Sequence, residues 1–133
     1  MVSFFNDVNV GGPEAWIPAV EYFGTRGFFP SYDAKASELL DNTTAGLWAA
    51  AFVKMAKNAK EEARPDPDAL AAELMKAEPG TKPVAAAAFL QSLGAPGADH
   101  GRDRAAELKI DVSASVTRGD ACRLMFALLG RVP

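Results

Sequence analysis

The spacing of apolar residues along the chain predicts a largely helical protein. Between residues 14 and 26, apolar side chains recur at intervals of three and four residues, which is the spacing of one helical face. These side chains are Trp16, Ala19, Val20 and Phe23. Pro18 is tolerated only in the first turn of a helix, so this helix must begin close to it. Gly27 predicts its end, because glycine is common just after the last helical turn.

Four more helices are predicted from the same spacing and from residues that start or stop helices. Their expected ranges are from just after Asp41 or Thr43 to about 63, then about 67–77, 82–93 and 118–129. Asp66 and Thr81 are the expected N-caps of the third and fourth helices, because their side-chain oxygens can accept a backbone N–H. The other segments are predicted as loops (28–40 and 95–101), a short helical turn (104–108) and an extended segment (109–116).

Size, composition and charge fit one mainly helical domain. The chain has 133 residues, of which 49% are hydrophobic, enough to bury a core. The formal net charge of −3 argues against nucleic-acid binding, which usually needs a basic face. No apolar run approaches the roughly 18 residues of a membrane span. Cys122 is the single cysteine, so no intrachain disulfide can form.

Two segments share a pattern in which an apolar helix is followed by glycine. Residues 17–27 and 84–94 both have this pattern, and each is followed by a long loop and then by a second apolar helix. An internal repeat implies units that cannot bury their apolar faces alone and therefore stack on one another. The sequence predicts a single domain of degenerate helix–loop–helix units at about 5–63 and 81–130, joined by a helix at about 67–77.

Several motifs make the chain resemble the S-layer homology family. They are Asp7-Val8, Trp16, Ala19-Val20, Gly27-Phe28-Phe29, Tyr32-Asp33 and Thr117-Arg118-Gly119-Asp120. In that family an aromatic residue precedes a first helix, a Gly-Tyr-Asp-like loop follows, and Thr-Arg-Ala-Glu opens a second helix. The resemblance covers about 5–52 and, more weakly, 82–129. It implies a helical repeat fold and, by the family's function, binding to bacterial cell-wall polysaccharide at the cell envelope.

The chain also departs from that family's pattern. The first unit has Asp41-Asn42-Thr43-Thr44 where the family has Thr-Arg, and the second has Lys82-Pro83 where the family has an aromatic residue. Two units are visible in the sequence, whereas the family typically has three. Residues 26–34 and 117–122 also resemble a degenerate helical domain at the C-terminal end of some bacterial FAD-dependent oxidoreductases. That resemblance implies an accessory domain that packs on a parent enzyme or a protein partner.

The segment Thr117-Arg118-Gly119-Asp120 is the sharpest candidate site. With Thr117 as N-cap and Asp120 three residues later, it matches a short-armed capping box, and this structural interpretation is favoured. In the alternative, Arg118 and free N–H groups at the helix start bind a carboxylate, such as the pyruvyl ketal on the cell-wall glycan that the S-layer homology family binds. Trp16 is a candidate for stacking on a sugar, although its place on an apolar helical face favours core packing.

No combination of residues predicts catalysis, a cofactor or a metal. His100 is the only histidine, and a single histidine flanked by Asp99 and Asp103 is rarely a zinc site. Cys122 lies beside the apolar face of the last helix, which favours a buried structural thiol over a nucleophile. The dinucleotide-binding pattern Gly-x-Gly-x-x-Gly is missing, so we expect no flavin binding. The sequence therefore favours a non-catalytic accessory domain of a larger bacterial protein, with an S-layer-type glycan anchor as the alternative.

Overall fold

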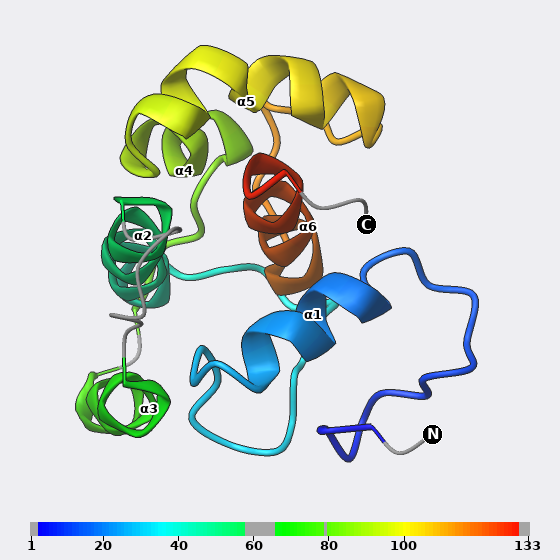
Figure 1. Ribbon diagram of the computed structural model, residues 1–133, viewed down its shortest axis with the longest axis vertical. Coiled ribbons are helices and arrows are strands. Elements are labelled where there is room, and N and C mark those ends of the chain that lie inside the picture. The colour runs from blue at the N-terminus through cyan, green and yellow to red at the C-terminus, as the bar shows by residue number, and fades with distance from the viewer. Residues whose placement is uncertain (1–2, 58–65, 79, 131–133) are drawn as a thin grey trace.

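The computed structural model describes residues 3–57, 66–78 and 80–130, and these residues form a mainly helical fold, as the sequence predicts. Its helices are α1 (Ile17–Gly24), α2 (Asn42–Lys57), α3 (Pro67–Lys76), α4 (Ala86–Ser92), α5 (Ala95–Glu107) and α6 (Arg118–Leu128). In Figure 1, α6 lies between α5 and α1, and α3 lies at the edge of the molecule beside α2. The predicted end of the second helix near residue 63 falls outside the described residues.

Several helix ends lie where local chemistry places them. Pro18 is in the first turn of α1, where its missing N–H removes no helical hydrogen bond. Helix α1 ends earlier than predicted, at Gly24 with Thr25 as its C-cap, and Gly27, which has a φ of 85°, closes the turn that follows. Asp66 is the N-cap of α3, as predicted, because its side chain accepts the N–H of Asp68 at 3.0 Å.

Three short extended segments meet at the centre of the domain. The N–H of Leu40 donates to the carbonyl of Val116 (2.9 Å), that of Val116 to Val84 (2.9 Å), and that of Val84 to Leu40 (3.2 Å). These bonds form a closed cycle, which we call the central triangle. Each of the three residues lies two positions before a helix, α2, α4 or α6. The central triangle therefore holds together three helix starts that are far apart in the sequence.

The helices fall into an inner and an outer set. The inner helices α2, α4 and α6 begin at the central triangle, and the outer helices α3, α5 and α1 pack on them in that order. Helix α1 begins differently, since its N-cap Trp16 has helical backbone angles. By the way the helices start, α4 therefore belongs with α2 and α6. The internal repeat in the sequence instead pairs residues 17–27, which contain α1, with residues 84–94, which contain α4. The division of the chain into two units stays a prediction.

The predicted start of the fourth helix is wrong. Helix α4 begins at Ala86, and its N-cap is Ala85 instead of Thr81. Residues 83–85 are extended because they pair with two distant segments, at Asp41 and Ser115. The predicted extended segment at 109–116 is not a continuous strand: it has a turn at residues 112–113 and an isolated bridge at Ser115. These long-range pairings leave no mark on local helical spacing.

The prediction of a loop over residues 95–101 is also wrong, because α5 runs through it. Pro96 lies in the first turn of α5, and the buried face of the helix is made of Gly97, Gly101 and Ala105. A Cβ added at Gly101 would lie 2.8 Å from Leu90 of α4, so the two helices are in close contact. Because two of these three buried residues are glycine, the buried face has little apolar periodicity, and the sequence predicted only the last turn of this helix, at 104–108.

Helix capping differs among the inner helices and provides a test of the fold. The N–H of Thr44 in α2 and that of Asp120 in α6 donate to the cap side chains of Asp41 and Thr117, but Ala85 of α4 has no side-chain oxygen. Because Ala85 has the extended backbone of an N-cap, Ala85→Ser should stabilise the domain by about 1 kcal/mol. Urea unfolding measures the effect.

The matched control for this prediction is Ala88→Ser, at an exposed position in the first turn of the same helix. That hydroxyl is not at the cap position, so it should give no gain. An equal effect of both serines on the free energy of unfolding would contradict the prediction.

Candidate functional site

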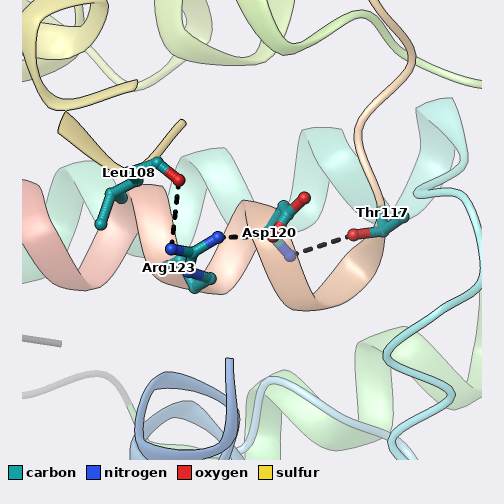
Figure 2. A network of polar contacts seen from close by, with 4 residues as sticks. All are labelled: Leu108, Thr117, Asp120 and Arg123. Atoms are coloured by element: carbon teal, nitrogen blue, oxygen red, sulfur yellow. Dashed lines mark hydrogen bonds and ion pairs between the residues drawn. The ribbon is translucent and has the colours of Figure 1, made fainter. Parts of the chain in front are cut away.

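The start of α6 confirms the predicted capping role of Thr117. Thr117 has extended backbone angles, and its hydroxyl oxygen accepts the N–H of Asp120 at 3.1 Å (Figure 2). The carboxylate of Asp120 does not complete a capping box with the Thr117 N–H. Instead it forms an ion pair with Arg123 one turn further along the helix, at 3.1 Å.

Arg123 connects α6 to the end of α5. Its second terminal nitrogen donates to the carbonyl of Leu108, the residue that follows α5, at 3.2 Å (Figure 2). A cation at this place satisfies a carbonyl at the helix end and interacts favourably with the helix dipole. The acidic residue of the candidate motif thus acts through Arg123 in packing two helices together.

The N–H groups in the first turn of α6 are all occupied. Those of Arg118 and Gly119 donate to the carbonyls of Glu38 and Ala36, both at 2.9 Å. Those of the next two residues donate to the Thr117 hydroxyl and carbonyl oxygens. The free N–H groups that the carboxylate-binding interpretation expected here are therefore not available, because the loop before α2 fills the site with its own carbonyls.

The side chain of Arg118 is also engaged within the chain. Its Nε donates to the carbonyl of Ala34 at 3.1 Å, and its guanidinium carbon lies 5.3 Å from the ring centres of Phe29 and of Trp48. Burial lowers the pKa of the Arg118 guanidinium, and nearby carboxylates partly offset this. The group stays charged, since arginine does not lose its proton in proteins. Arg118 thus fixes the loop before α2 against the start of α6.

The surroundings of Arg118 are acidic. The carboxylates of Asp41, Glu38 and Asp7 all act on its charge. Asp7 also accepts the N–H groups of Ala34 and of its neighbour in the chain, both at 2.8 Å. An anionic ligand that approached Arg118 would meet these three carboxylates, which repel it. The charges around Arg118 therefore suit an internal contact better than an anion site.

Because the pKa of Asp41 is lowered, the free energy of unfolding should fall at acidic pH. Burial alone would raise the pKa of Asp41, but hydrogen bonds from the Thr44 N–H (2.8 Å) and hydroxyl (2.9 Å), with the charge of Arg118, lower it below 3.8. This stabilisation is present above pH 3.8 and is lost as the pH falls through the lowered pKa. Asp41→Asn keeps a capping side chain, so urea unfolding from about pH 5 to about pH 2.5 should give it a shallower loss of stability than the wild type. Equal pH dependence of the two proteins would contradict this.

Trp16 packs against the same helix start. A Cβ at Gly119 would lie 2.9 Å from Cγ of Trp16, so the indole lies directly on the glycine. The Trp16 side chain is half-buried and packs on the core, in keeping with the core-packing interpretation. The structure therefore brings Trp16 together with the motif at the start of α6, with no space between them at Gly119.

The other candidate residues lie apart from this place. His100 is exposed on α5, and within residues 3–57, 66–78 and 80–130 no group of three or more metal-binding side chains occurs. Cys122 is fully buried, and burial raises the pKa of its thiol, so the reactive thiolate is disfavoured. The described helices include none with the length and apolar character needed to span a membrane.

An open groove of about 640 Å³ was not predicted from the sequence. It lies between the first turns of α2 and the end of α3, and its lining residues are Asn42, Thr43, Gly46, Leu47, Glu73, Lys76 and Ala77. No motif spans these residues, because they come from two helices whose contact depends on the fold.

In comparisons with known proteins, no family model, curated protein or solved structure matches the chain.

Proposed function

We propose that this domain is a non-catalytic accessory or interaction domain of a larger bacterial protein. The observation that carries the proposal is the internal use of the candidate site. The first-turn N–H groups of α6 and the Nε of Arg118 all bind the chain's own atoms. A motif used in this way holds elements of the domain together. The resemblance of residues 26–34 and 117–122 suggests an FAD-dependent oxidoreductase as the parent.

A second candidate is an S-layer-type anchor for cell-wall polysaccharide. The arrangement of three inner helices around the central triangle supports it, since the family typically has three repeats. The two terminal nitrogens of Arg118 also support it, because they form no hydrogen bond within the described part of the chain. Against it stand the three carboxylates around Arg118 and the occupied N–H groups. We therefore rank the anchor second.

The accessory proposal is tested by the size and composition of the native polypeptide. An antibody raised against the purified domain should detect, in extracts of the source bacterium, a polypeptide much larger than 14.0 kDa. Mass spectrometry of the captured polypeptide should identify an enzyme domain in the same chain. A native polypeptide of about the size of the domain itself, or one whose remaining sequence contains no enzyme domain, would contradict the proposal.

A further inference from the structure

Helix α3 is held to the rest of the domain much more weakly than the other outer helices. Leu70 and Leu74 are its only buried side chains, and its Met75 is 70% exposed. No hydrogen bond or ion pair joins α3 to another element of the described structure. By contrast, the end of α5 is bound by Arg123 of α6, and α1 buries five residues along its face.

The packing between α3 and α2 is also incomplete. A shallow groove of about 640 Å³, open to solvent, lies where the end of α3 meets the start of α2, and Leu47 and Ala77 are among its lining residues. Side chains that line a groove open to solvent bury less apolar area than those in a close-packed interface. One close backbone contact remains, at the start of α3, where a Cβ at Gly27 would overlap the carbonyl of Pro67.

The central triangle does not depend on α3. Its hydrogen bonds join Leu40, Val84 and Val116, and the first turns of the inner helices bind loops outside α3. Elements with few buried apolar contacts open at lower free energy than the core, often as cooperative units. Helix α3 therefore meets both conditions for separate opening: it is weakly attached, and the hydrogen bonds of the central triangle form without it.

We propose that α3 is a flap that detaches from α2 as a unit while the inner helices and the central triangle stay folded. The open state presents Leu70 and Leu74, together with the face of α2 that they cover, as one apolar surface that the closed state lacks. This device is independent of whether the parent protein is an oxidoreductase.

Amide hydrogen exchange, followed by mass spectrometry of the full chain, tests the flap. Peptides from residues 66–78 should exchange about a hundredfold faster than those from α4 and α6, yet more slowly than an unstructured chain. Leu74→Ala should speed exchange in α3 by about thirtyfold or more. This factor corresponds to the smallest stability loss usually seen when a buried leucine is replaced by alanine. Exchange in α4 and α6 can rise by at most the same factor, because the unfolded state through which they exchange also lacks the Leu74 contact, so the roughly hundredfold gap between α3 and these helices should remain.

Met75, the exposed neighbour of Leu74, provides the matched control, since Met75→Ala shortens a side chain that lies outside the core. It should leave the exchange of α3 within about twofold of the wild type. Equal exchange rates in all helices would overturn the proposal, as would full exposure of α3 in the wild type. A Leu74→Ala variant that fails to fold, or in which α3 and α6 exchange at the same rate, would also overturn it, because α3 would then open only with the whole domain.

Discussion

Gly97→Ala is expected to destabilise the domain by about 3 kcal/mol. A Cβ at this position would overlap the carbonyl oxygen of Leu90 and lie 2.9 Å from Cβ of Leu93, both on or next to α4. Because one of these atoms is backbone, rotation of a side chain cannot relieve the overlap, and α5 must move away from α4. The free energy of unfolding in urea, measured with the slope of the transition, gives the size of the loss.

Gly46→Ala is the matched control for Gly97→Ala. Gly46 is an exposed glycine within α2, and a Cβ there would meet nothing within 4 Å. Alanine should stabilise the helix there by about 0.5–1 kcal/mol, because glycine loses more backbone entropy. Opposite signs for the two variants are the expected result. A Gly97→Ala protein as stable as the wild type would show that α4 and α5 are not packed as described.

Arg118→Ala is expected to cost about 2–4 kcal/mol of stability. The change removes the hydrogen bond to the Ala34 carbonyl and the contacts with the rings of Phe29 and Trp48. It also leaves three nearby carboxylates without the cation that they surround. Thr117→Ala should cost only about 1 kcal/mol, the usual loss for an N-cap.

This order reverses the one that the sequence alone suggests. From the sequence alone, Thr117→Ala would be the costlier change, because Thr117 is recognisable as an N-cap whereas the burial of Arg118 is not visible. Arg102→Ala is the control, since Arg102 is exposed on α5 and should change stability by less than about 0.5 kcal/mol. An Arg118→Ala variant no less stable than Arg102→Ala would contradict the structural role of Arg118.

Local signals predict the fold well where they exist. Helices α1, α3 and α6 could be predicted because each has an apolar face and recognisable residues at its ends, such as Asp66 and Thr117. Helix α5 was predicted only in its last turn, because Gly97 and Gly101 pack closely without any apolar signal. The central triangle could not be predicted, since backbone hydrogen bonds between distant segments do not depend on which side chains are present.

The same distinction applies to the candidate site. The capping role of Thr117 depends on three neighbouring residues, so the sequence was sufficient to predict it. Whether the N–H groups of the helix start were free depended on carbonyls at Ala36 and Glu38, about 80 positions away. The acidic surroundings of Arg118 likewise come from two separate segments, at Asp7 and in the loop that contains Glu38 and Asp41.

Co-sedimentation of the wild-type domain with purified bacterial cell-wall fragments tests the central claim most directly, namely that the motif at the start of α6 is structural. Bovine albumin is the control for trapped protein, and Arg118→Lys keeps the charge but loses the planar fork that binds carboxylates in pairs. Circular dichroism checks that the variant is folded. We expect no more wild-type protein than albumin in the pellet. Clear co-sedimentation of the wild type that folded Arg118→Lys loses would contradict the account and favour the glycan anchor.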